Sequence, residues 1–415
     1  MIMKKVIAAL QMTNDAVINF LKKYWLWLSL ATIFALAIVA RIPLYSKTTG
    51  DYNSFLVNWY NDCYTNSKEF LAKGDVDYTP TYLYSFVVMT WFKIKPFTNS
   101  FLYTLKTISV VFDFGTAFLI FYMVKFIFKK NDVLTLISTT LALFLPQILL
   151  NSAFWGQCDS IYTFFIVLSL FFIFIKKEML SAISFGISFA LKLQSVFFLP
   201  VLVLLWLNKK YKFWYLLLIP LTYIVLMIPA MICGRSFISC LTVYFTQAEE
   251  YTYLSMAAPN IYSFMYKTLT TNDSVASHLV PAATVFGLVL ILVVCVIIFA
   301  TQKDYSFENI IKISFFITLF APYVLPKMHD RYFYIAEVLA ILYIVINPKK
   351  WYISLLAVGG TFQGYNLYLF NTYYLGNRDF NMIIGATLIM AALILLGYDL
   401  FKKKNEPQLE VAQEN

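Results

Sequence analysis

Five short stretches of the sequence hold side chains whose types suit proton transfer and the binding of an anion. A carboxylate can accept a proton from a hydroxyl group, and lysine and arginine side chains bind phosphate through charge-assisted hydrogen bonds. The stretches lie far apart and carry Asp51 and Tyr52, Asp77 and Tyr78, Gln157 and Asp159, Lys192 and Gln194, and His329, Asp330 and Arg331. Gathered in one pocket, these residues would combine a base with several positive groups.

Asp51 lies in Gly50-Asp51-Tyr52, shortly after the first long apolar segment. Its carboxylate could act as a general base. It also precedes a short amphipathic stretch at 55–60, so it could instead cap the N-terminus of a helix. From its position alone, the cap is the simpler interpretation.

The other carboxylates also have structural interpretations. Asp77 precedes Pro80 and suits the start of a helix, and Asp159 could cap the helix that follows a tight connection. Lys192 lies in an apolar region where an unpaired ammonium group is costly, so we expect Asp159 or Asp113 to neutralise it. Asp113 lies in the middle of an apolar segment, and we expect it to belong to a structural ion pair.

The elements that must position these residues are helices in a membrane. Sixty percent of the 415 residues are hydrophobic, and apolar runs recur along the whole chain, so a soluble domain could not bury them. The composition predicts one all-α polytopic membrane domain at 1–404 and a disordered charged tail at 405–415. The net charge of +10 comes from short basic clusters between apolar runs. It therefore indicates topology and not nucleic-acid binding.

The five cysteines are scattered and show no metal-binding spacing. We expect them to be core residues without disulfide bonds. The segments predicted to be cytoplasmic contain no paired carboxylates of the kind that bind a nucleotide diphosphate with a metal. The sequence therefore predicts neither a metal nor another cofactor.

The basic clusters define the expected path of the chain, because lysine-rich loops stay in the cytoplasm. Clusters at 22–23, 125–130, 176–177, 209–212, 349–350 and 402–404 must be separated by even numbers of crossings. This rule predicts about twelve transmembrane segments with both termini cytoplasmic, and external loops at 42–100 and 234–278. The apolar stretch at 82–92 is too short to cross, so we expect an interfacial helix there.

The stretch from Met179 to Leu207 lies between two cytoplasmic lysine clusters but is too short for two full spans. We expect two half-membrane helices that turn around Lys192 and Gln194. Such broken helices normally line a cavity. On this topology nearly all the candidate residues lie on the external side, which predicts one site there.

The sequence from Lys327 to Tyr332 offers an ammonium group, an imidazole and a guanidinium within five residues. The planar, permanently charged guanidinium of Arg331 matches the geometry of a phosphate. Basic and aromatic residues also flank membrane spans for structural reasons. A basic cluster on the external side runs against the usual cytoplasmic bias, which favours a function.

Taken in order, the motifs resemble those of lipid-carrier-dependent glycosyltransferases of the GT-C superfamily. The likeness is to the dolichyl-phosphate-glucose glucosyltransferases of asparagine-linked glycosylation and to bacterial mannosyltransferases related to the second GPI-anchor mannosyltransferase. The motifs cover about two thirds of the chain and are Gly50-Asp51-Tyr52 with Trp59, Asp77-Tyr78-Thr79-Pro80, Trp155-Gly156-Gln157-Cys158-Asp159, Leu191-Lys192-Leu193-Gln194 and His329-Asp330-Arg331-Tyr332.

The resemblance implies a first external loop that carries the catalytic carboxylate, here Asp51, and amphipathic helices that cover the site. It also implies a polyprenyl-phosphate-hexose donor and a glycan or lipid-linked acceptor in the cell membrane. The sequence departs from the family pattern at two motifs, and these differences bear on the identity of the sugar more than on the type of reaction. The family often has Tyr-Pro-Pro in place of Tyr78-Thr79-Pro80, and a His-Glu-Lys-like motif in place of His329-Asp330-Arg331.

The expected reaction is a single displacement with inversion at the anomeric carbon, in a monomeric enzyme. Asp51 takes the proton of the acceptor hydroxyl, while Arg331, His329 and Lys192 hold the phosphate of the donor. The remaining candidates are expected to orient Lys192 or to contact the sugar or the acceptor: Gln157, Asp159, Gln194, Tyr52, Asp77, Tyr78 and Asp330.

Two alternatives remain open from the sequence. A flippase or transporter of lipid-linked glycans would use similar charges, but spread through the depth of the membrane. A glycan polymerase or ligase would use a lipid-diphosphate donor, and the number of phosphates on the donor separates it from the first interpretation.

Overall fold

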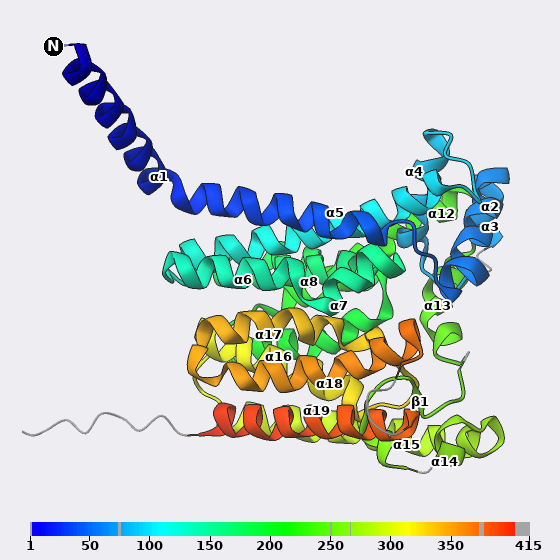
Figure 1. The fold of residues 1–415 in the computed structure, drawn as a ribbon. Helices are drawn as coiled ribbons and strands as arrows, with labels where there is room; N and C mark the ends of the chain where they lie inside the picture. The colour runs from blue at the N-terminus through cyan, green and yellow to red at the C-terminus, as the bar shows by residue number, and fades with distance from the viewer. Residues whose placement is uncertain (1, 74–75, 250, 266, 373–376, 403–415) are drawn as a thin grey trace, which may run out of the picture.

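The chain forms an elongated bundle of helices in the computed structural model (Figure 1). The structure describes residues 2–73, 76–249, 251–265, 267–372 and 377–402, with side chains from residue 13 onward. The tail predicted at 405–415 lies outside the described residues. The expectation of an all-α fold is confirmed in its main feature, and a two-stranded pairing near residue 329 is the one addition to it within the described ranges.

The first part of the chain supplies a long helix, a group of short helices and three helices of the bundle. Their bounds are α1 Ile2–Arg41, η1 Ile42–Leu44, η2 Tyr52–Leu56, α2 Val57–Thr65, α3 Ser67–Lys73, α4 Pro80–Trp91, α5 Asn99–Tyr122, η3 Met123–Ile127, α6 Asp132–Phe144, α7 Pro146–Leu149, η4 Leu150–Trp155 and α8 Asp159–Phe174.

The second part continues the bundle and closes it with α19 beside α18. Its elements are α9 Glu178–Leu191, η5 Leu193–Phe198, α10 Leu199–Leu207, α11 Phe213–Leu216, α12 Leu218–Ile232, α13 Phe237–Glu249, β1 Ser255–Met256, η6 Ile261–Phe264, α14 Lys267–Thr271, α15 Asp273–Thr301, α16 Phe307–Val324, β2 Met328–His329, η7 Asp330–Phe333, α17 Tyr334–Ile346, η8 Pro348–Lys350, α18 Trp351–Phe370 and α19 Arg378–Phe401.

Several of these helices are long and apolar enough to cross a membrane. Among the described residues six qualify, or seven if the bent pair formed by α6 with α7 and η4 counts as one span. The chain is therefore a multi-pass membrane protein. Other predicted segments are helical but shorter, such as α8 and α17, because polar groups and breaks interrupt the apolar runs. The predicted count of twelve crossings stays a prediction.

Burial separates the centre of the bundle from its edge. Helices α16 and α17 run through the middle, and nearly all their side chains are buried. Helices α1, α12 and α15 lie at the edge and expose large apolar side chains, among them Leu288, Leu292 and Val296 of α15. An outward apolar surface of this kind suits contact with lipid chains and not with water.

The two ends of the bundle differ (Figure 1). At the end where α1 finishes and α5 begins, the chain forms the short helices α2, α3, α4, α13 and α14. Tight turns that contain lysines join the helices at the opposite end, for example Lys129, Lys176 and Lys349. The helix predicted at 82–92 is found at the first end as α4.

The break at Lys192 was predicted from the sequence, whereas the bend at Pro146 was not. The chain bends by 43° between α6 and the segment that starts at Pro146, because proline cannot continue the hydrogen-bond ladder of a helix. Lys192 has an extended backbone and separates α9 from η5, as expected for the two short helices. Gly156 has a φ of 77° in the connection before α8, a conformation that favours glycine.

Candidate active site

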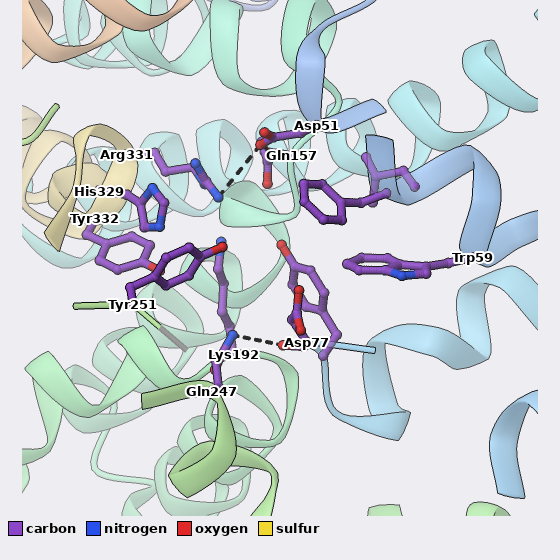
Figure 2. A pocket seen from close by; sticks show the side chains of 13 residues that line it. Asp51, Trp59, Asp77, Gln157, Lys192, Gln247, Tyr251, His329, Arg331 and Tyr332 are labelled. Carbon is purple, nitrogen blue, oxygen red and sulfur yellow. Dashed lines mark hydrogen bonds and ion pairs between the residues drawn. The ribbon is translucent and has the colours of Figure 1, made fainter. Parts of the chain in front are cut away.

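A pocket of mixed polarity lies at the end of the bundle that carries the short helices. We call it the Asp51 pocket (Figure 2). Segments far apart in the sequence meet in it, and its lining is Asp51, Phe55, Leu56, Trp59, Asp77, Tyr78, Gln157, Lys192, Gln247, Tyr251, His329, Arg331 and Tyr332. Asp51, Asp77, Gln157, Lys192, His329 and Arg331 had been predicted to share one site, and the structure brings them together.

The carboxylate of Asp51 is held by three hydrogen-bond donors. Gln157 Nε2 lies 2.6 Å and Trp155 Nε1 lies 3.1 Å from Asp51 Oδ2, and the Tyr368 hydroxyl donates to Oδ1. Asp51 has helical backbone angles and makes no capping hydrogen bond with its side chain. The capping interpretation is therefore wrong, and the carboxylate faces the pocket with its orientation fixed.

A buried lysine fixes the segment that leads to Asp51. Lys106 on α5 donates hydrogen bonds to the carbonyl oxygens of Leu44, Tyr45 and Lys47, at 2.9, 3.1 and 2.6 Å. These carbonyl groups follow the end of α1, and helix ends leave acceptors without an intrahelical partner. The carbonyl oxygen of Leu44 also accepts a 3.2 Å hydrogen bond from the backbone of Lys47. Lys106 therefore pairs them and anchors the path to Asp51.

Arg331 lies among three carboxylates. The distances from its guanidinium nitrogens are 3.7 Å to Asp51, 3.9 Å to Asp159 and 3.7 Å to Asp330. Its guanidinium carbon also lies 4.9 Å from the ring centroid of Trp155. These ion pairs are longer than direct hydrogen bonds, and Nε has no hydrogen-bond partner among the described residues. The guanidinium thus keeps donor capacity for another anion.

Lys192 is already paired. Its Nζ lies 2.6 Å from Oδ1 of Asp159, and the second oxygen of Asp159 accepts a 2.9 Å hydrogen bond from Asn151. The expectation that Asp159 neutralises Lys192 is confirmed, and Asp159 makes no capping hydrogen bond that would explain it otherwise. Asp113 lies elsewhere and pairs with Arg41 at 3.1 Å, as expected for a structural ion pair.

His329 is neutral at neutral pH. Burial, together with the charges of Arg331 and Lys192, holds the pKa of its imidazole well below the ordinary value. The ring packs against Tyr251 and Tyr332, with centroid distances of 5.3 and 5.0 Å. His329 can therefore offer an N–H group to an anion but contributes no positive charge.

Asp330 is buried beside the site and keeps its proton at neutral pH. Burial raises the pKa of Asp330 to about 8, and the charges of Asp51 and Asp159 add to this effect while that of Arg331 opposes it. Neither oxygen of Asp330 has a hydrogen-bond partner among the described residues. With Asp330 protonated, the carboxylates that remain close to Arg331 are those of Asp51, at 3.7 Å, and Asp159, at 3.9 Å.

Four predicted residues do not line the Asp51 pocket: Asp159 and Asp330 lie behind it, 3.9 and 3.7 Å from Arg331, and Tyr52 and Gln194 lie elsewhere. Tyr52 is buried and stacks on Phe101, with ring centroids 5.9 Å apart. Gln194 lines a neighbouring apolar pocket instead. Asp77 and Tyr78 do line the Asp51 pocket, and the carbonyl oxygen of Asp77 accepts a 2.8 Å hydrogen bond from Gln247.

The sequence had not singled out several residues that shape the site. Gln247 and Tyr251 come from the second predicted external loop, and Tyr368 comes from the end of α18. A parallel pairing of β1 with β2 holds Met256 beside His329 and brings Tyr251 to the pocket. Only the prediction of an external loop at 234–278 could have indicated Gln247 and Tyr251.

Metal binding has no evident basis within the described ranges. No group of three or more His, Cys, Asp or Glu residues there could hold a metal ion. All five cysteines are free, and Cys63, Cys158 and Cys240 are buried, as expected for core residues.

Fold and site together define a multi-pass membrane protein with a pocket of carboxylates and cations at one end. The sequence matches the model of glycosyltransferase family 87 over residues 77–322, which is more than half of the chain. The chain belongs to this family, and the protein is therefore a glycosyltransferase. No curated protein matches the sequence. Asp51 and His329 to Arg331 lie outside the matched segment, so geometry carries the argument for their roles.

Proposed function

We propose that the protein is an inverting hexosyltransferase that uses a polyprenyl-phosphate sugar, glucose or a mannose-like hexose, as donor. The acceptor is a cell-envelope or lipid-linked glycan. The observation that carries the proposal is the 3.7 Å distance between Arg331 and Asp51. It joins a base for the acceptor and a cation for the donor in one pocket, although 279 residues separate them in the sequence.

The chemistry requires both groups. The acceptor oxygen attacks the anomeric carbon and gives its proton to Asp51, while the bond from that carbon to the phosphate oxygen breaks. The leaving phosphate is a stable anion, so it needs positive charge and hydrogen-bond donors and not a strong acid. Arg331 would supply both, and neutral His329 would add one N–H donor.

Lys192 has a less direct role in this proposal than the sequence indicated. Its ammonium group is bound tightly to Asp159, so it acts on the donor through its field and through the orientation of Asp159. Gln157, in contrast, orients the base itself. Asp77 and Tyr78 stand where they would contact a sugar or an acceptor.

An apolar pocket beside the site supports a lipid carrier. It is lined by Leu193, Val196, Phe197 and Leu288 and shares Gln247, Tyr251 and Tyr332 with the Asp51 pocket. A further apolar pocket continues from Val196 and Leu288 along α10 and α15. A polyprenyl chain in these grooves would bring its phosphate to Arg331.

The same proposal includes the orientation of the protein in the cell membrane. The active site would face outward, with both termini cytoplasmic and the protein a monomer. The lysine-rich turns at the end of the bundle opposite the Asp51 pocket support this orientation.

The test uses the full-length protein in proteoliposomes with a panel of polyprenyl-phosphate hexoses. We expect sugar transfer or slow sugar release from at least one donor. Asp51→Asn should lower the rate about 10² to 10⁴-fold, the usual loss on removal of a general base, while donor binding persists. Asp62→Asn, in the exposed part of the neighbouring α2, is the matched control. Wild-type rates in Asp51→Asn would contradict the proposal.

A further inference from the structure

A second polar pocket lies between α13 and the segment at Val76 and Asp77. We call it the α13 pocket. It shares Asp77 and Gln247 with the Asp51 pocket, so these two residues form the wall between the two spaces. In Figure 2 this wall, with the hydrogen bond from Gln247 to Asp77, lies across the pocket from Asp51.

Helix α13 has two different faces. Phe237, Ile238, Leu241 and Phe245 are exposed on one face and give it an apolar surface. Ser239, Thr242, Thr246 and Gln247 line the α13 pocket on the other face. A helix with this pattern lies at the membrane surface with its apolar side in lipid. The α13 pocket is therefore within reach of the headgroup of a membrane lipid.

The α13 pocket contains a buried arginine that the proposed reaction does not use. Arg235 is 4% exposed, and its Nε donates a 3.3 Å hydrogen bond to Ser239. No carboxylate of the described residues forms an ion pair with it, and its Nη1 has no hydrogen-bond partner among them. Asp77 and Glu249 line the same pocket but form no ion pair with Arg235, so the buried guanidinium keeps a donor for an anion that enters the pocket.

We propose that the α13 pocket binds the acceptor, and that the acceptor carries an anionic group, a phosphate or a carboxylate, which Arg235 recognises. This inference rests on the proposed function. The serine and threonine side chains of α13, with Asp77 and Gln247, then bind the hydroxyl groups of the sugar. Glu249 at the exposed end of α13 also lines the pocket and suits hydroxyl groups and not a second anion.

The length of the α13 pocket limits the distance between the anionic group of the acceptor and its reacting hydroxyl group. Ser239, beside Arg235, and Gln247, at the wall, are eight residues apart on one helix, a separation of about 12 Å. This distance is comparable with the length of a disaccharide. An acceptor whose anionic group is bound by Arg235 would thus present a hydroxyl group of its first or second sugar at the wall, facing Asp51.

The first test measures binding of a simple anionic sugar. Glucose 6-phosphate is titrated against full-length protein in nanodiscs of zwitterionic lipid, and methyl glucoside serves as the neutral probe. The Arg331→Gln background removes the arginine proposed to bind the donor phosphate. We expect Arg235→Gln to weaken glucose 6-phosphate binding about 10- to 100-fold, the value of one or two charge-assisted hydrogen bonds. Arg378→Gln, an exposed arginine, is the matched control.

The second test separates acceptor binding from the donor reaction. Thr242→Trp fills the α13 pocket and should abolish transfer to a total lipid extract of the source cells, while slow hydrolysis of the donor by water persists and reports an intact fold. Equal binding of glucose 6-phosphate in Arg235→Gln, or wild-type transfer in Thr242→Trp, overturns the inference alone. Failure of the wild-type protein to use any polyprenyl-phosphate hexose overturns the proposed function, and the binding test still decides whether Arg235 recognises an anion.

Discussion

The ammonium group of Lys192 lies 2.6 Å from Oδ1 of Asp159, and the two side chains are 3% and 0% exposed. The pair joins the break between α9 and η5 to the first turn of α8. Burial makes each charge dependent on the other, because a buried charge without its partner is strongly destabilising. Stability and activity therefore both depend on this pair, and variants can separate them.

Lys192→Met should destabilise the protein by about 3 to 5 kcal/mol, since it leaves Asp159 buried without its main cation. The double variant Lys192→Met with Asp159→Asn should recover most of that stability, because neither charge remains. We expect the double variant to stay nearly inactive, since the site loses the field of the ammonium group. Thermal unfolding and sugar transfer are measured on both, and an active double variant would show that the pair is only structural.

Variants of Arg331 test whether its guanidinium binds the phosphate of the donor. Its ion pairs with Asp51 and Asp159, at 3.7 and 3.9 Å, leave its donors available. Arg331→Ala should weaken donor binding about 100-fold, and Arg331→Lys about tenfold, because lysine keeps the charge but loses the planar pair of donors. Donor affinity is measured by titration in nanodiscs, with Arg378→Ala as control. Unchanged affinity in Arg331→Ala would remove the phosphate role.

The stability of the folded protein should depend on pH through Asp330. Its folded pKa of about 8 lies above the ordinary value of about 4 for an unfolded chain. Between these values the folded state keeps a proton that the unfolded state has released, so the free energy of unfolding falls as the pH rises toward 8. Below about pH 4 the contribution is fully present, because both states are protonated.

Asp330→Asn should remove this decrease in the free energy of unfolding, because asparagine does not titrate. The unfolding temperature of the variant should rise relative to that of the wild type as the pH increases from 5 to 8, measured in detergent solution. Above pH 8 the ionised carboxylate of the wild type would also compete for Arg331, which lies 3.7 Å away. Donor affinity should therefore fall in the wild type and not in the variant. Parallel curves for the two proteins would refute the assignment.

The variant Lys106→Met tests whether sugar transfer requires the segment before Asp51 to be held in place. Lys106→Met removes three hydrogen bonds to the carbonyl groups of residues 44, 45 and 47. Residues 44 and 45 are half-buried and Lys47 is exposed, so the cost in stability stays below the roughly 1 to 3 kcal/mol of a fully buried acceptor left unpaired. We expect a lower transfer rate with little change in donor affinity, and faster hydrogen exchange at residues 45–52. Lys95→Met, an exposed lysine, is the control. A wild-type rate would show that Gln157 and Trp155 suffice to place Asp51.

Much of the fold and half of the site could be predicted from the sequence, because apolar runs and their breaks report local structure directly. The break at Lys192 and the ion pair with Asp159 followed from the cost of a buried charge. The orientation of Asp51 toward the pocket did not follow from its position, for which a helix cap was the simpler interpretation. Its three donors come from residues more than one hundred positions away, and such contacts leave no local pattern.

The protonation state of His329 could not be predicted from the sequence either. His329 and Arg331 were both expected to act as cations, but burial beside Arg331 and Lys192 leaves the imidazole neutral. Lys106 was missed because a lysine in an apolar helix has no visible partner until the end of α1 is placed beside it. The number of crossings stays open for a similar reason, since several helices are shorter than a full span.

Gly364 on α18 tests how closely the segment around His329 must approach that helix. A Cβ atom at Gly364 would lie 2.6 Å from the carbonyl oxygen of Ala257 and 2.8 Å from Cβ of Asp330, so one of these segments would have to move. Gly364→Ala should therefore shift the β1–β2 pairing and lower both donor affinity and the unfolding temperature. Gly359→Ala on the same helix meets no atom within 4 Å and should be neutral or stabilising by up to about 1 kcal/mol, since alanine favours a helix. Equal behaviour of the two variants in unfolding and donor titration would show that this contact does not position the site.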